Sequence, residues 1–147
     1  MNNALFASEK HDWETPAQFF AELNREFNFT LDPCCYPQTA KAKTYYTKSE
    51  NGLIQNWAGH TVFCNPPYGS EIGEWAKKCY QESRKPGTTV VLLIPSRTDT
   101  AYFHDWIYRK AELRFVRGRL KFVGAKSSAP FPSMLAVYRV HCHPQPD

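Results

Sequence analysis

The chain has 147 residues, of which 42% are hydrophobic and 15% aromatic, with a formal net charge of +4 and a pI near 8.8. This size and composition fit one compact domain with a single core and disfavour two independent domains. The mild basic excess is compatible with a polyanionic partner but does not demand one.

The first expected element is a helix from about residue 16 to about residue 27, where apolar residues recur at helical spacing. Thr15, Pro16 and Gln18 have the residue types of an N-cap, a first helical position and a capping-box partner. We therefore expect the Thr15 hydroxyl to cap this helix.

A short extended run, Phe29 to Leu31, follows and ends at Asp32-Pro33, because proline stops a strand. Asp32 is therefore expected at the carboxyl end of a strand. The segment from Tyr36 to Asn56 is irregular, with Thr44 to Thr47 as a possible strand and Asn51-Gly52 as a turn.

Thr61 to Cys64 predicts a second apolar strand, which is broken by Asn65-Pro66-Pro67-Tyr68. Ser70 is expected to cap the amphipathic helix that comes next. Thr88 to Ile94 is apolar at nearly every position, which is typical of a central parallel strand covered on both faces.

The remaining expected elements are a helix carrying Tyr102, Phe103, Trp106 and Ile107, a charged strand Glu112 to Val116, a basic loop over residues 117–126, and a last strand Met134 to Val140. Strands that alternate with helices indicate a doubly wound α/β fold with a mostly parallel sheet. Such sheets bind ligands beyond the carboxyl ends of their strands, where Asp32 and Asn65 both fall.

Five cysteines, an odd number with two of them adjacent, argue against a secreted disulfide framework and favour a reducing cytoplasmic compartment. The N-terminus shows no secretory signal and no apolar run could span a bilayer, so we expect a soluble, unprocessed protein.

The densest group of metal-capable side chains is His141, Cys142 and His143. Successive side chains on an extended segment face opposite sides, so we expect no metal site there.

The tetrapeptide Asn65-Pro66-Pro67-Tyr68 is the most informative in the chain, because two prolines make the turn stiff and leave carbonyl oxygens available. The Asn65 side-chain oxygen and the Pro66 carbonyl could accept the two hydrogens of an aromatic amine such as N6 of adenine. Tyr68 could then stack on a base swung out of a duplex. The alternative is a proline-rich connection with a packed tyrosine.

The chain resembles the phage-type DNA N6-adenine methyltransferases over roughly residues 12–138. The resemblance is carried, in chain order, by WETP at Trp13–Pro16, FNFTLDPCC ending at Cys35, ENGLIQNW at Glu50–Trp57, NPPY, IPSRTDT at Ile94–Thr100 and GRLKF at Gly118–Phe122. It implies a Rossmann-like methyltransferase fold, S-adenosylmethionine as methyl donor, and transfer to N6 of a flipped-out adenine in DNA.

Residue by residue, the resemblance implies catalytic roles for Asn65, Pro66, Pro67 and Tyr68. It implies cofactor contacts by Trp13, by Thr15 and Pro16 at the methionine end, by the acidic motif Asp32, Pro33 and Cys34, and by Glu50, Asn51 and Leu53 beside the adenosine. One departure is plain in the sequence: residues 32–37 contain no glycine, whereas many methyltransferases have a glycine-rich loop at this point.

DNA is the expected partner, and the candidate contacts are basic side chains. They are Arg97 after the buried strand, and Arg114, Arg117, Arg119 and Lys121 around the aromatic Phe122. By residue type alone, a solvated basic hairpin is an equally good interpretation of the second group. Arg97 is the better candidate, because it lies at the catalytic end of the expected sheet.

Three alternatives stay open or are disfavoured. Cytosine C5 methylation needs a cysteine nucleophile at the base, but Cys34 in the dipeptide Pro33-Cys34 lies at the cofactor strand. A glutamine N-methyltransferase would use the same NPPY chemistry on a carboxamide. A DNA-binding module that has lost the cofactor would explain the missing glycine loop.

We expect residues 1–142 to form the catalytic domain and 143–147 a polar tail, with no obligate protein partner evident.

Overall fold

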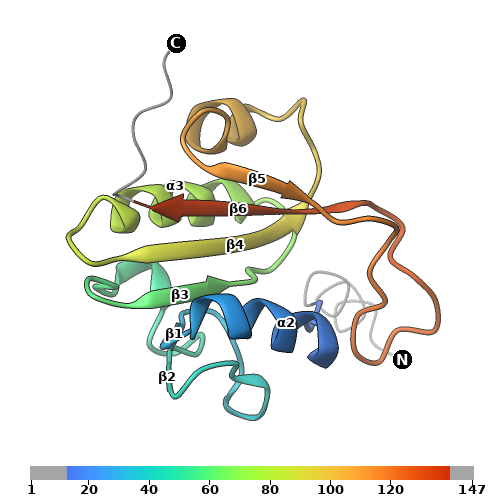
Figure 1. The fold of residues 1–147 in the computed structure, drawn as a ribbon, viewed down its shortest axis with the longest axis horizontal. Coiled ribbons are helices and arrows are strands. Elements are labelled where there is room, and N and C mark those ends of the chain that lie inside the picture. Colours follow the sequence, from blue (N-terminus) through green and yellow to red (C-terminus); the bar gives the residue numbers. More distant parts are fainter. Residues whose placement is uncertain (1–12, 140–147) are drawn as a thin grey trace.

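The computed structural model describes residues 13–139, which form one six-stranded sheet in the order β2-β1-β3-β4-β6-β5 (Figure 1). The strands are β1 (Leu31–Asp32), β2 (Thr44–Tyr45), β3 (Thr61–Cys64), β4 (Thr89–Pro95), β5 (Glu112–Phe115) and β6 (Ser133–Arg139). Neighbours from β2 to β4 pair in parallel, whereas β6 is antiparallel to both β4 and β5. Within this sheet β6 alone is reversed, so the expected mostly parallel sheet is confirmed.

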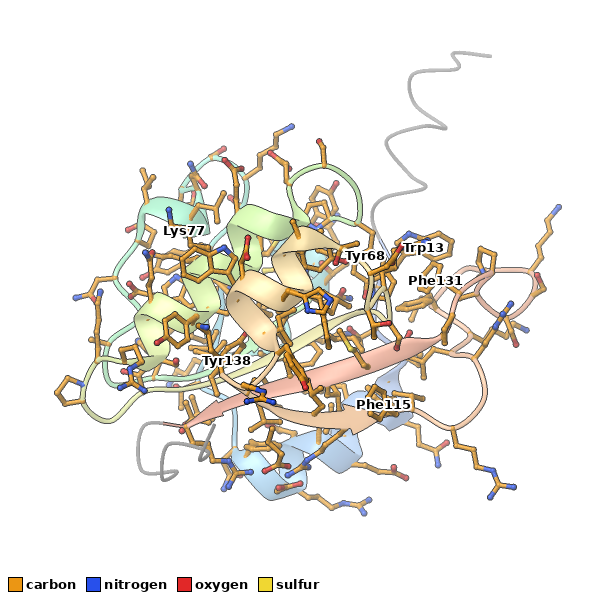
Figure 2. The ribbon with its side chains drawn as sticks, turned by 90° about the horizontal axis from the view of Figure 1, so that it is seen from above. Trp13, Tyr68, Lys77, Phe115, Phe131 and Tyr138 are labelled. Atoms are coloured by element: carbon orange, nitrogen blue, oxygen red, sulfur yellow. The ribbon has the colours of Figure 1, made fainter. Side chains whose placement is uncertain are left out.

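Helices cover the sheet on both faces, and Figure 2 shows the resulting three layers. The helix α2 (Ala17–Phe27) lies on one face, where Phe20 packs on Phe29 and Phe63 at ring distances of 5.6 and 5.1 Å. The helix α3 (Ile72–Ser83) and the single π-helical turn η3 (Phe103–Ile107) lie together on the other face. Two short 3₁₀ turns, η1 (Pro37–Thr39) and η2 (Gly52–Ile54), occupy the segment predicted to be irregular.

The core is centred on β4, which lies between β3 and β6. Every residue from Val90 to Ile94 is fully buried, because α2 and α3 cover opposite faces of this strand. Each such aliphatic side chain contributes about 1.5–3 kcal/mol relative to an exposed one. The prediction of a central strand covered on both faces is therefore confirmed.

The predicted start of α2 is right, but its predicted cap is wrong. Pro16 occupies the N-cap position, and the Thr15 hydroxyl instead accepts a hydrogen bond from Asn65 at 2.9 Å. The predicted Ser70 cap of α3 is also wrong. Glu71 is the N-cap residue, and the backbone carbonyl of Gly69 accepts from the Ile72 N–H at 3.3 Å, so the backbone replaces the expected serine side chain.

Some predicted elements lie outside the described residues, namely Val140, the group His141, Cys142 and His143, and the tail 143–147. Between residues 13 and 139, none of the helices has the length and apolar character required to cross a membrane. The expected helix carrying Tyr102, Phe103, Trp106 and Ile107 is present over residues 101–107, and its last five residues form the π-helical turn η3.

Candidate active site

A cavity of about 800 Å³ lies at the carboxyl ends of β1 and β3. It has two halves. The half that follows β1 and β2 is lined by Asp32, Pro33, Cys34, Cys35, Tyr36, Thr39, Lys41, Thr47, Lys48, Asn51, Gly52 and Leu53. The other half lies around the end of β3. It is lined by Phe63 of β3, by residues after this strand and in α3 (Asn65, Pro66, Pro67, Tyr68, Gly69, Ser70, Glu71 and Trp75), by the segment before α2 (Trp13, Glu14 and Thr15) and by Val123.

Asn65 stands at the end of β3 and has its amide group held by the segment before α2. The Asn65 Nδ2 donates to the backbone carbonyl of Trp13 and to the hydroxyl of Thr15. The Asn65 Oδ1 is buried, and among residues 13–139 it meets no hydrogen-bond donor. An unsatisfied buried acceptor costs about 1–3 kcal/mol, so a ligand that brings an N–H to this oxygen is stabilised.

The two prolines continue the turn and lead into Tyr68. None of the hydrogen bonds found within residues 13–139 ends on the Pro66 carbonyl oxygen, so it too can accept. The Tyr68 hydroxyl donates to the Leu93 carbonyl at 3.2 Å, and its ring meets Phe122 and Phe131 edge to face. Burial raises the pKa of this phenol well above its usual value. Tyr68 therefore lies in one fixed position in the cavity wall.

Asp32 is the buried carboxyl of the other half. Its two oxygens accept the backbone N–H groups of Cys34 at 3.2 Å and Lys41 at 2.9 Å. Burial raises the pKa of Asp32 to about 6, although these hydrogen bonds act in the opposite direction. The carboxyl is therefore poised to ionise near neutral pH, which favours binding of a cation beside it.

Cys35 contributes its thiol to the same corner, with weak contacts to the carbonyl oxygens of Asp32 and Tyr46. Burial, reinforced by the Asp32 carboxyl, raises the pKa of Cys35 to about 12. A thiol in this state is a poor nucleophile, because the thiolate is the reactive form.

Not every residue predicted to bind the cofactor lines the cavity. Of the described candidates, Pro16 and Glu50 are outside its wall. Pro16 starts α2. The exposed Glu50 carboxylate is folded back onto Thr47 and accepts from its backbone N–H at 2.8 Å and its hydroxyl at 2.7 Å. These local hydrogen bonds lower the pKa of Glu50.

The predicted basic residues lie in two different settings. Arg97, Arg117, Arg119 and Lys121 are exposed, the last three on the segment 116–132 that joins β5 to β6. Arg114 instead forms two parallel 2.7 Å hydrogen bonds to Glu26 of α2 and also pairs with Glu112. Its guanidinium is thus committed to bonds within the fold.

The segment 116–132 reaches the cavity. Its Val123 N–H donates to the Glu14 carbonyl at 3.0 Å, and its aromatic residues Phe122 and Phe131 pack on Trp13 at 5.4 and 5.3 Å. Figure 2 shows Trp13, Tyr68 and Phe131 gathered at the same end of the molecule. The basic residues of this segment therefore lie on a loop that is anchored to the cavity wall.

Sequence reasoning missed several lining residues, among them Lys41, Gly52 and Val123. Lys41 contributes a backbone N–H, which carries no sequence signal. Val123 is apolar yet 52% exposed in the structure. In the sequence, the only indication of its role is an apolar residue within a basic loop that is expected at the surface.

Three comparisons place the chain among known proteins. A family model described as "DNA N-6-adenine-methyltransferase (Dam)" matches residues 3–144. The protein "Putative methyltransferase YfdM" of Escherichia coli (strain K12) is 35% identical over 63 residues, which cover 38% of this chain and 69% of that protein. The crystal structure of the 23S rRNA methyltransferase ErmE superposes with a TM-score of 0.54 at 11% identity, covering 87% of this chain and 70% of the other. The last similarity concerns the fold alone.

Proposed function

Because the chain belongs to the DNA N-6-adenine-methyltransferase (Dam) family, we propose that it transfers a methyl group from S-adenosylmethionine to N6 of an adenine in DNA. The observation that supports this most directly is the Asn65 amide oxygen, a buried acceptor without a donor at the wall of the cavity. Such an oxygen matches the exocyclic amino group of adenine, which carries two hydrogens to donate.

The residues of the first half of the cavity fit the proposed methyl donor. S-adenosylmethionine, when bound, supplies an electrophilic methyl group on a positively charged sulfur. Asp32 would offer a carboxylate to the positive charge of this ligand, since the site is buried and its pKa of about 6 leaves it ionised at neutral pH. Pro33 and Cys34 follow it, and Asn51 and Leu53 of the second loop line the same cavity.

The residues of the second half would act on the base. The N6 lone pair of adenine is delocalised into the ring, which makes the nitrogen a poor nucleophile. Acceptance of its two hydrogens by Asn65 Oδ1 and the Pro66 carbonyl would draw the nitrogen toward tetrahedral geometry and aim its lone pair. Tyr68 would support the flipped base, a contact worth about 1–3 kcal/mol. Cys35 takes no part, because its thiol stays protonated.

The proposed DNA contacts are Arg117, Arg119 and Lys121 on the segment anchored to the cavity wall, together with Arg97 after β4. Exposed cations of this kind bind phosphates and release counterions. Arg114 is left out of this proposal, because its guanidinium is bonded to Glu26 and Glu112.

The test is to incubate the protein with isotopically labelled S-adenosylmethionine and, separately, duplex DNA, single-stranded DNA, structured RNA and a glutamine-containing peptide. Digestion and mass spectrometry then identify the labelled product. Labelled N6-methyladenine in DNA, absent with the Asn65→Ala variant, is the expected result. Label in the peptide alone would favour a glutamine N-methyltransferase. If calorimetry detects no binding of S-adenosylmethionine, with or without DNA, the result would favour a DNA-binding module that has lost the cofactor.

A further inference from the structure

The amide of Asn65 has one orientation that its surroundings allow. A backbone carbonyl can only accept hydrogen bonds, so the nitrogen of the amide, and not its oxygen, must face Trp13. With the amide reversed, two oxygens would stand against each other. The oxygen is therefore on the side away from Trp13, where it lacks a donor among residues 13–139.

Thr15 makes the second bond that holds the amide in place. Its hydroxyl oxygen lies 2.9 Å from the Asn65 Nδ2, although the two residues are 50 positions apart in the chain. Thr15 is only 1% exposed. Since Pro16 takes the N-cap position of α2, the hydroxyl is free of the capping role that its sequence context predicts.

We propose that Thr15 is a positioning residue of the methyl transfer, which holds the Asn65 amide so that its oxygen faces the amino group of the target base. This inference rests on the proposed function. It differs from the role that the family resemblance implies for Thr15, which is contact with the methionine end of the cofactor. The two roles predict different kinetic effects, so they can be separated.

The segment that carries Thr15 is also bound to the segment 116–132. The Glu14 carbonyl accepts the Val123 N–H at 3.0 Å, and Trp13 packs edge to face on Phe122 and Phe131. Figure 2 shows Trp13 and Phe131 side by side near Tyr68. The two acceptors for the Asn65 nitrogen therefore belong to a segment bonded to the rest of the fold.

The first experiment replaces Thr15 by valine, which keeps the shape and removes the hydroxyl, and by serine, which keeps the hydroxyl. We expect Thr15→Val to lower kcat about tenfold, because the Asn65 oxygen is held less firmly and its bond to the base in the transition state is weakened, with little change in the Kd of S-adenosylmethionine. Thr15→Ser should restore most of kcat. A wild-type kcat in Thr15→Val would overturn the proposal, as would weaker donor binding with an unchanged kcat at saturation.

Thr88→Val is a matched control. Thr88 is 2% exposed, and its hydroxyl accepts the Gly59 N–H at 2.9 Å beside the amino end of β4, away from the cavity. This variant should lose stability as Thr15→Val does, with kcat unchanged. An equal fall of kcat in both variants would show that the loss of a buried hydroxyl acts through stability and not through Asn65.

A double-mutant cycle tests whether Thr15 acts through Asn65. Once Asn65→Ala has removed the amide, the addition of Thr15→Val should cause no further fall in kcat. A second, multiplicative loss would contradict the proposal.

A measurement without substrate separates this inference from the proposed function. In ¹⁵N-resolved NMR spectra, the two Asn65 side-chain amide protons should move toward the positions of a solvent-exposed amide in Thr15→Val and stay near the wild-type positions in Thr15→Ser. Unchanged resonances in Thr15→Val would show that the hydroxyl does not hold the amide. If wild-type protein methylates no adenine at all, the proposed function fails, while the NMR result still decides whether Thr15 orients Asn65.

Discussion

The α-carbon of Gly52 lies against the carbonyl oxygen of Pro33, so closely that a β-carbon at position 52 would come within 2.0 Å of that oxygen. Residues 32–37 contain no glycine, yet the two loops that line one half of the cavity meet without a side chain between them. The glycine that permits this approach is on the second loop, where the Gly52 carbonyl also accepts the Trp57 indole N–H at 2.9 Å.

Gly52→Ala should therefore destabilise the protein by about 2 kcal/mol and weaken S-adenosylmethionine binding, because the backbone of one loop must move. Denaturant unfolding and calorimetry measure the two effects. Gly73→Ala, near the start of α3, is the control, since its β-carbon would meet only an ordinary contact at 3.4 Å. That variant should be neutral or up to about 1 kcal/mol more stable. Equal stability of the two variants would contradict the role given to Gly52.

Asn65→Ala should retain S-adenosylmethionine binding and lose about 100-fold or more in kcat, because it removes an acceptor whose bond strengthens in the transition state. Single-turnover kinetics at saturating donor and DNA measure this loss. Turnover close to that of the wild-type protein would refute the role of the amide oxygen.

Replacement of Arg117 and Arg119 together by alanine should weaken DNA binding and reduce the slope of log K against log salt by about 1.8, at about 0.9 per phosphate contact. Binding titrations between low and moderate salt provide the slope. Arg114→Gln should leave the slope unchanged and lower the free energy of unfolding by about 1 kcal/mol or less, because the variant loses a partly exposed ion pair with Glu26. A flatter slope in Arg114→Gln would instead place that residue on the DNA.

The pKa of Asp32 predicts opposite pH effects on ligand binding and on folding. Binding of the positively charged donor should weaken as the pH falls through about 6, because the carboxyl becomes neutral. In the free protein, the folded state holds this proton up to pH about 6, whereas the unfolded chain releases it near pH 3.8. The stability that Asp32 contributes is therefore full below about pH 4 and is lost as the pH rises to 6.

Calorimetric titrations and denaturant unfolding at several pH values between 4 and 8 compare the wild-type protein with Asp32→Asn. In Asp32→Asn, neither the donor affinity nor the free energy of unfolding should show these pH effects between pH 4 and 8. A wild-type donor affinity that is constant from pH 5 to pH 8 would remove Asp32 from the proposed donor site.

Much of the sheet was predictable, because its strands are coded by short local patterns. Thr61–Cys64 is apolar and ends at two prolines, and its bounds agree with those of β3. The run before Pro95 is buried on both sides and reads as one apolar block. The family resemblance and the fold class followed from motifs whose order along the chain matched.

The contacts between distant segments were not predictable in the same way. Thr15 has the residue type of a helix cap, and nothing near it in the sequence indicates that its hydroxyl reaches Asn65. Arg114 belongs to a run of basic residues, but its partner Glu26 is 88 positions away. In both cases tertiary geometry decided between two uses of the same polar group, and a single sequence does not reveal which use prevails.

Residues 116–132 leave the sheet at β5 and return to it at β6, and the Val116 N–H bonded to the Ser133 carbonyl at 3.1 Å closes the base of this excursion (Figure 1). Because the two ends of the excursion lie at neighbouring positions of one strand pair, its length can change without a change in the register of β5 and β6. A segment of different length would still have to keep the bond from residue 123 to the Glu14 carbonyl and the packing of Phe122 and Phe131 on Trp13.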